Sequence, residues 1–346
     1  MRLRTPLSYF YSFTGVRMYH VTVLGFDSAF ASAITGISDL LSTTGVTWNY
    51  IHGEQMEQKF QVEVATLNGT PVRCANGIEI KAHKALHEIE KTDVLLIPTI
   101  GGSIPQTLEK NQALLPWIKQ QHALGADIAS NCTGAFLLAE SGLLNNKKAT
   151  THWGFIEAFQ QRFPQVDLQP DQLITADGSL FCSGGGMAWF DMALFLIERY
   201  CGYDVAMASS KAYVIDIGRG SQSAYSSIPG KRYHQDESIL LLQEWLDKHY
   251  HEAIDIDLLA TLANMTERTL KRRFKQATGD SPINYLQRLR IESAKKLLES
   301  GRDSVESITH HIGYEDVSSF IRLFKKHTGQ SPSVYRARFS RRFFKT

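Results

Sequence analysis

The stretch "DIASNCTGAFLLAESG", from Asp127 to Gly142, decides the fold of the larger part of this 346-residue chain. Its opening residues are typical of a short buried strand, and "TGAFLLAESG" is typical of a buried helix. The small residues between them allow the sharp strand-to-helix elbow on which many hydrolases carry their nucleophile. Because Cys132 stands at that elbow, the stretch raises the question of whether this thiol is catalytic.

Strand-like and helix-like segments alternate around this stretch. The strand-like segments are "YHVTVLGF", "KFQVEVATL", "DVLLIPTI", "ADIAS" and "LITADGSLFCSGG". Such alternation predicts an α/β domain with a mostly parallel sheet and helices on both faces.

Ligands of such sheets bind beyond the carboxyl ends of the strands. The candidate ligand-binding residues at those ends are Gly101, Gly102, Cys132, Thr133, His152 and Gly184. We expect the glycines, with Gly185, to leave backbone N–H groups free for an anionic ligand, although glycines at strand ends also serve turns. His152 has the alternative role of a satisfied pocket or core histidine.

The composition is that of a soluble globular protein, with 43% hydrophobic and 21% charged residues. The longest apolar runs are shorter than the roughly 18 residues that span a bilayer. Four cysteines without short-range pairing suggest free thiols in a reducing compartment, and zinc-type CxxC spacing is absent. We therefore expect a cytoplasmic protein with no membrane association, no metal and no cofactor.

The net charge of +2 conceals an asymmetry between the two halves of the chain. Residues 1–230 carry 16 basic and 20 acidic side chains, whereas residues 231–346 carry 21 and 15. The C-terminal part therefore has a net charge of +6, which favours a polyanionic partner. A solvated basic surface is the alternative explanation.

An internal repeat lies in this basic part. Leu270–Tyr285, "LKRRFKQATGDSPINY", and Phe320–Tyr335, "FIRLFKKHTGQSPSVY", are identical at eight of sixteen positions. In each copy "TG.SP" predicts a helix that ends at the glycine and another that begins at Ser-Pro. Each copy follows a shorter helix and a tight turn, so the sequence predicts an all-α domain with two helix-turn-helix units. A helical protein-binding bundle is the alternative.

The second helix of each unit, capped by Thr266 or Asp316, is the expected reader of DNA. Its predicted DNA-binding residues are Glu267, Arg268, Lys271, Arg272 and Lys275 in the first unit and Ser318, Ser319, Arg322 and Lys325 in the second. Arginine matches guanine bidentately, whereas lysine suits phosphates. Any one of these side chains could instead be solvated or contact phosphate alone.

These motifs resemble the DNA-binding domain of the AraC/XylS family over residues 237–339. One departure is Thr309, where that family usually has alanine, so we expect some loosening of the second unit. "IPTIGG", "CTGAFLLAESGLL", "ATTHW" and "CSGGGMAWFDMAL" resemble the sensor domain of GlxA-type regulators, in the ThiJ/PfpI class of the glutamine-amidotransferase-like superfamily.

The resemblance implies an answer for Cys132. Enzymes of that superfamily pair the elbow cysteine with a histidine, often the next residue, and with an acidic residue; here Thr133 and Ala33 stand at those positions. Without these partners we expect no catalysis. The alternatives are a cysteine-dependent amidase or peptidase with a DNA-binding anchor, a redox sensor, a ligand-independent scaffold, or a cysteine that merely fits the turn.

The sequence therefore predicts a DNA-binding regulator that activates transcription and forms a homodimer. We expect it to have no enzymatic activity. Its expected partners are promoter DNA, RNA polymerase and a small-molecule effector, which the resemblance suggests is an amino acid or amine. The predicted parts are a disordered extension over 1–17, a sensor and dimerisation domain over 18–215, a linker over 216–236, the DNA-binding domain over 237–339 and a basic tail over 340–346. Translation could start at Met1 or at Met18, which directly precedes the first strand.

Overall fold

The computed structural model describes residues 17–226, 234–301 and 303–340. The chain divides into two compact units, residues 1–220 and 221–346, and each has its own core. The division falls inside the predicted linker, of which residues 227–233 lie outside the described residues. Nearly all of the predicted N-terminal extension and basic tail also lie outside them.

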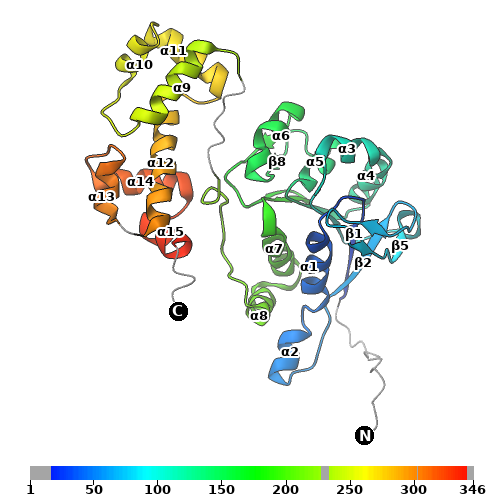
Figure 1. The fold of residues 1–346 in the computed structure, drawn as a ribbon. Helices are drawn as coiled ribbons and strands as arrows, with labels where there is room; N and C mark the ends of the chain where they lie inside the picture. The colour runs from blue at the N-terminus through cyan, green and yellow to red at the C-terminus, as the bar shows by residue number, and fades with distance from the viewer. Residues whose placement is uncertain (1–16, 227–233, 302, 341–346) are drawn as a thin grey trace. The chain divides into compact units, whose positions relative to one another are not determined.

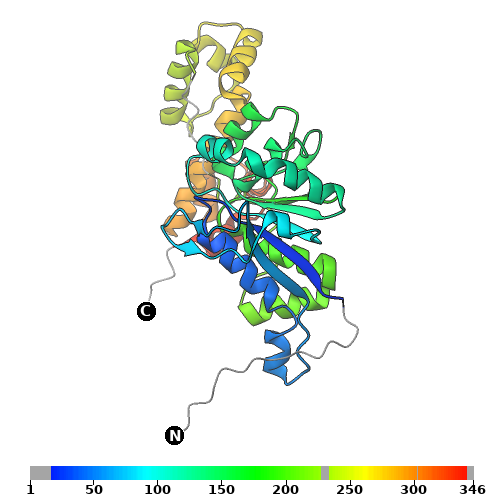
Figure 2. The same ribbon diagram turned by 90° about the vertical axis from the view of Figure 1, so that its right-hand side faces the viewer.

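The first unit is built on a seven-stranded sheet with the order β10-β11-β7-β6-β1-β2-β5. Its strands are β1 (Tyr19–Leu24), β2 (Phe60–Thr66), β5 (Lys84–Ala85), β6 (Val94–Ile97), β7 (Asp127–Asn131), β10 (Ile174–Asp177) and β11 (Leu180–Ser183). All neighbours are parallel except β10 and β11, which form a hairpin that turns at Gly178. Figure 2 shows β1 and β2 side by side.

Helices cover both faces of this sheet (Figure 1), which confirms the predicted α/β class. On one face lie α1 (Ala31–Ser42), α7 (Trp189–Cys201) and α8 (Tyr203–Tyr213), with α2 (Thr47–His52) against α8; on the other lie α3 (Ile104–Lys110), α4 (Leu115–Ala123), α5 (Gly134–Glu140) and α6 (Ile156–Arg162). Two-residue strands form the small sheets β3 (Val72–Arg73) with β4 (Glu79–Ile80) and β8 (Lys148–Ala149) with β9 (Asp167–Leu168).

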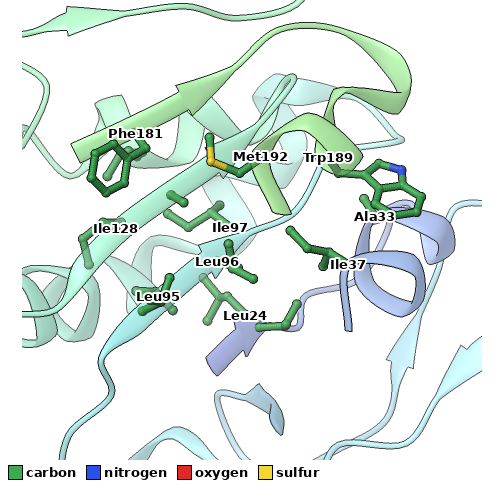
Figure 3. Close-up of a cluster of buried hydrophobic side chains, with 14 of the residues drawn as sticks. Leu24, Ala33, Ile37, Leu95, Leu96, Ile97, Ile128, Phe181, Trp189 and Met192 are labelled. Atoms are coloured by element: carbon green, nitrogen blue, oxygen red, sulfur yellow. The ribbon is translucent and has the colours of Figure 1, made fainter. Parts of the chain in front are cut away.

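The indole ring of Trp189 covers the core on the face of the sheet where α1 lies. Trp189 lies beside Ala33 in Figure 3, at the edge of a cluster that also contains Leu96, Ile37 and Met192. A Cβ on Gly36 would lie 2.0 Å from Cη2 of Trp189, so α1 approaches this ring more closely than any residue with a side chain would permit. The packing therefore fills the surroundings of Ala33 with apolar atoms.

The second unit is all helical. Its helices are α9 (Glu237–His249), α10 (Ile256–Leu262), α11 (Glu267–Thr278), α12 (Pro282–Ser300), α13 (Val305–His311), α14 (Val317–Thr328) and α15 (Pro332–Phe339). α9 to α11 and α13 to α15 form two bundles joined by α12 (Figure 1), each with its own apolar cluster. The predicted two helix-turn-helix units are thus present.

Local signals explain why these helices begin and end where they do. The hydroxyl oxygen of Thr266 and the carboxylate of Asp316 accept backbone N–H bonds at the starts of α11 and α14. Gly279 and Gly329 end both helices in the left-handed conformation. Thr309 is fully buried, and its hydroxyl donates to the Val305 carbonyl at 2.8 Å, so this residue is accommodated without an unsatisfied hydroxyl.

Arg290, a buried cation on α12, connects the two bundles. Its guanidinium donates to the carbonyls of Tyr250 and Glu252, both at 2.7 Å, before α10. The same group lies 4.9 Å from the ring centroid of Tyr314, in the turn between α13 and α14. Since Arg290 is 8% exposed, these contacts replace its hydration and fix both the α9–α10 connection and the α13–α14 turn to α12.

We predict that Arg290→Ala lowers the stability of the second unit by about 2–4 kcal/mol, because two backbone carbonyls lose the donor that joins them to α12. Arg288→Ala is the matched control: Arg288 bonds Asp280 at 2.6 Å but is 38% exposed, and its loss should cost below about 1 kcal/mol. Calorimetry of the full chain measures both. Equal effects would mean that apolar packing alone joins the bundles.

Candidate functional site

The first reading helix, α11, separates apolar from basic side chains around its axis. Leu270 and Phe274 are fully buried in the bundle core. Arg268, Arg272 and Lys275 are exposed, as the sequence predicts. The helix thus presents a continuous basic face that the core does not use.

The same plan recurs in α14. Phe320 and Phe324 are fully buried, while Ser318, Arg322 and Lys325 are exposed. The Asp316 carboxylate accepts the backbone N–H bonds of Ser318 and Ser319 at 3.2 and 2.7 Å, and the Ser319 hydroxyl accepts from Arg322 at 2.9 Å. These bonds hold the N-terminal turn, which is the part of a recognition helix that contacts bases.

Two acidic side chains, Glu267 and Asp257, lie beside the basic face of α11. Glu267 pairs with Lys271 at 2.5 Å, and this ammonium lowers the pKa of Glu267. The Glu267 carboxylate lies close to that of Asp257 of α10, and this proximity raises the pKa of Asp257. No ion pair in the described part of the chain uses Arg268 or Arg272, so these two remain available for guanine or phosphate.

The elbow of the first unit has an unusual backbone at Cys132. Its φ is +56°, a left-handed conformation that side chains disfavour, and its N–H donates to the Ser183 carbonyl at 2.9 Å. A Cβ on Gly134 would lie 2.5 Å from the Pro98 carbonyl oxygen, so glycine is required where α5 crosses the end of β6. The predicted strand-to-helix elbow is confirmed.

The Cys132 thiol is buried, with an exposed fraction of 4%. Burial raises its pKa, although donors that include the Gly186 N–H and the Thr133 and Thr99 side chains act in the opposite direction. The sulfur is therefore protonated at neutral pH, which disfavours nucleophilic or redox chemistry. The alternatives of a redox sensor and a cysteine-dependent enzyme would each need a thiol of lowered pKa.

Two of the glycines at the strand ends use their N–H groups in tertiary hydrogen bonds. The N–H of Gly101 donates to the Ser28 carbonyl and that of Gly184 to the Leu173 carbonyl, both at 2.7 Å. A Cβ on Gly185 would lie 2.2 Å from the His152 ring. The expectation that Gly101 and Gly184 leave their N–H groups free is therefore wrong, because tertiary contacts use those groups.

His152 lies against this glycine loop. Its Nδ1 accepts the Gly154 N–H at 2.9 Å, and burial lowers its pKa, so the imidazole is neutral at pH 7. The neighbouring Thr151 hydroxyl donates to the Cys132 carbonyl at 2.9 Å, which ties the two segments together. The structure thus gathers the predicted ligand residues at one edge of the sheet, with Cys132, Thr133 and Gly184 buried.

A network of buried hydrogen bonds lies beneath the elbow, and the sequence does not predict it. The Asn131 amide donates to the Thr99 hydroxyl at 2.7 Å and accepts from Ser183 at 2.6 Å. Asn131 and Ser183 end the neighbouring strands β7 and β11, and Thr99 lies two residues beyond the end of β6. Their polar side chains within or just beyond otherwise apolar strands are the only sign of this network in the sequence. That sign does not reveal which residues hydrogen-bond to one another.

The accessible space beside the elbow is a groove of about 610 Å³ between α3 and α6. It is lined by Gly102, Ser103, Ile104, Pro105, Leu108, Phe136, Phe155, Ala158, Gln161 and Arg162. Of the predicted ligand residues, Gly102 belongs to this lining. Phe155 connects the groove to His152, with ring centroids 5.6 Å apart.

Within residues 17–226, 234–301 and 303–340, no helix is long and apolar enough to cross a membrane. The same part of the chain contains no group of three His, Cys, Asp or Glu side chains that could hold a metal ion.

Comparisons with known families match both units. A model of the DJ-1/PfpI family matches residues 44–199, and a helix-turn-helix domain model matches residues 259–338. The HTH-type transcriptional regulator CdhR of Pseudomonas aeruginosa is 29% identical over 80% of this chain and 82% of its own length. GlxA of Rhizobium meliloti, also an HTH-type transcriptional regulator, is 24% identical over 81% and 86%.

Two further matches concern the first unit. A solved transcriptional regulator protein from Vibrio parahaemolyticus is 26% identical, with a TM-score of 0.50, over 56% of this chain and 98% of that one. An isonitrile hydratase of Pseudomonas putida is 32% identical over 42% of this chain and 62% of its own length.

A DJ-1/PfpI domain followed by an AraC-type helix-turn-helix domain defines a class of DNA-binding transcriptional regulators. This chain combines the two domains and is similar over about four fifths of its length to the regulators CdhR and GlxA, as its sequence motifs predict.

We predict that Arg268→Ala or Arg272→Ala costs about 1–3 kcal/mol on the operator and relaxes preference at one base pair, because bidentate contacts are lost. Lys275→Ala should weaken binding to all sequences alike and reduce the salt dependence, as loss of a phosphate contact does. Titrations of specific and random duplexes at several salt concentrations separate the two effects. Equal losses on both duplexes for all three variants would refute the base contacts.

Proposed function

We propose that the first unit is a catalytically inactive sensor, and that a small-molecule effector bound in the α3–α6 groove changes how the second unit binds promoter DNA. The observation that carries this proposal is the placement of the groove at the carboxyl edge of the sheet, beside an elbow whose thiol is protonated. Gly101, Gly102, Cys132, Thr133, His152 and Gly184 remain the proposed surroundings of the ligand. The protein acts in the cytoplasm as an activator that contacts RNA polymerase.

Two features of the elbow support a sensor over an enzyme. Thr133 follows the cysteine, and its hydroxyl donates to the Ile100 carbonyl at 2.8 Å, so it offers no base. Ala33 stands where the superfamily's acidic residue would lie, in apolar surroundings closed by Trp189 (Figure 3). A carboxylate there would require rebuilding this core.

An enzyme is the second candidate, because the isonitrile hydratase shares 32% identity with the first unit. On this alternative Cys132 would act on a small substrate, and the second unit would anchor the enzyme to DNA. The buried thiol would then need a conformational change to reach substrate, since it is 4% exposed.

We predict that a compound screen against the full chain yields a hit that raises the melting temperature, corresponding to about 2.7 kcal/mol at a hundredfold excess over Kd. Ala158→Trp should abolish this shift, because the indole fills the groove. Ala123→Trp, at an exposed position on α4, is the control and should leave it unchanged.

The same hits distinguish the rival functions. Measurable hydration or hydrolysis of a hit that disappears in Cys132→Ala would establish the enzyme. A promoter response lost after peroxide treatment, and insensitive to peroxide in Cys132→Ala, would establish redox sensing. An unchanged thermal shift in Ala158→Trp would refute the groove as the effector site.

A homodimer through residues 18–215 is proposed because tethering two readers increases their joint affinity for DNA. Exposed apolar side chains gather on α2 and α8, which pack together: Tyr50 is 74% exposed, Ile51 62% and Tyr203 57%. Such a patch favours a protein partner over water, and a second copy suits the tethering argument.

We predict that light scattering of the full chain gives the mass of two copies at micromolar concentration. Ile51→Glu should shift the mass toward one copy, because it places a charge in the apolar patch. Leu124→Glu, at a 44% exposed leucine following α4, is the control and should retain the dimer. A monomeric wild-type chain would refute the proposal.

A further inference from the structure

The segment of residues 219–226, "RGSQSAYS", is bound at both of its ends, although it lies in the predicted linker. Arg219 and Gly220 belong to the first unit, and residues 221–226 belong to the second. Because it joins the two units, we name it the connecting segment.

Lys295 of α12 holds the C-terminal part of the connecting segment. It is 4% exposed, and its Nζ donates to the carbonyls of Ser226 at 2.6 Å and Ser223 at 3.3 Å. The third partner is the Glu292 carboxylate at 2.7 Å. Two of the three acceptors of this buried cation therefore come from the segment, and a buried cation without acceptors is costly.

Apolar and aromatic contacts add to this attachment. Ala224 is 5% exposed and joins the cluster of the second bundle with Ile291 and Leu298. The Tyr225 ring lies 5.4 Å from that of Phe339, and its hydroxyl accepts from Arg338. The segment is thus part of the core that supports α14.

The segment also reaches the end of a reading helix. A Cβ on Gly329, the C-cap of α14, would lie 3.3 Å from the Cβ of Ser221. Displacing the segment would therefore remove a neighbour of the turn from α14 to α15. The position of α14 depends on that turn.

At the other end, the segment is fixed to the proposed effector side of the first unit. Arg219 donates two hydrogen bonds to the Asp191 carboxylate in the first turn of α7, one of them through Nε at 3.0 Å. The Leu173 N–H donates to the Gly220 carbonyl, and the Leu173 carbonyl accepts from Gly184 at 2.7 Å. Gly184 is one of the proposed ligand residues.

We propose that the connecting segment transmits changes in the glycine loop at Gly184 to α14, with Lys295 as the positioning residue that couples the segment to the second reading unit. Contiguous contacts run from Gly184 through Leu173 and Gly220 to Ser221, and from there to the cores around Lys295 and Gly329. That an effector supplies the signal rests on the proposed function, but the coupling itself does not. The first reading unit, α10 and α11, lies outside this path.

Hydrogen exchange of the full chain, without effector or DNA, tests the coupling. Arg219→Ala releases the anchor in the first unit and should accelerate amide exchange in residues 317–339 by about fivefold to tenfold, with residues 256–278 unchanged. Arg73→Ala, which removes an exposed ion pair with Glu79 at 3.2 Å in the same unit, is the control and should change neither region.

Lys295→Met should accelerate the same residues, 317–339, and adding Arg219→Ala to it should produce no further increase, because both act through one path. If Lys295→Met does not fold, Tyr225→Ala replaces it in the cycle. Acceleration confined to residues 173–226 in Arg219→Ala, or additive effects in the double variant, would overturn the proposal. Neither outcome depends on whether the groove binds an effector.

Discussion

The left-handed backbone of Cys132 is the constraint on which the first unit depends. It turns the chain at the end of β7 so sharply that α5 crosses the Pro98 carbonyl, and only glycine fits at residue 134. This crossing puts Phe136 in the floor of the groove and buries the thiol. One residue in a disfavoured backbone conformation thereby places the groove beside a buried cysteine whose pKa is raised.

Features with local causes were predictable from the sequence. Thr266, Asp316, Gly279 and Gly329 fix helix ends through their own side chains or φ angles, so the repeat predicted both reading helices and their basic faces. Strand and helix periodicity likewise predicted the α/β sandwich. The exposed residues that we predict to bind DNA follow directly from that periodicity, because the buried positions of one helix face determine the exposed positions of the other.

Features that depend on tertiary contacts were not predictable. The strand-end glycines suggested free N–H groups, but the Ser28 and Leu173 carbonyls, remote in sequence, occupy those of Gly101 and Gly184. The groove combines α3 and α6, which lie on the same face but far apart in the chain. Arg290 and Lys295 resemble ordinary helix-surface cations in sequence, and only the packed structure shows that backbone carbonyls surround them.

The two reading helices share their buried positions but differ in what they expose. Arg268 and Lys271 of α11 correspond to Ser318 and Ile321 of α14, whereas Arg272 and Arg322 are alike. If the two helices read successive segments of one duplex, as we predict, a chain bound in the reverse direction would place each face against the base pairs of the other. Each bound copy would then have a polarity along the promoter. A regulator of this construction specifies both where it binds and which way it faces relative to the start of transcription.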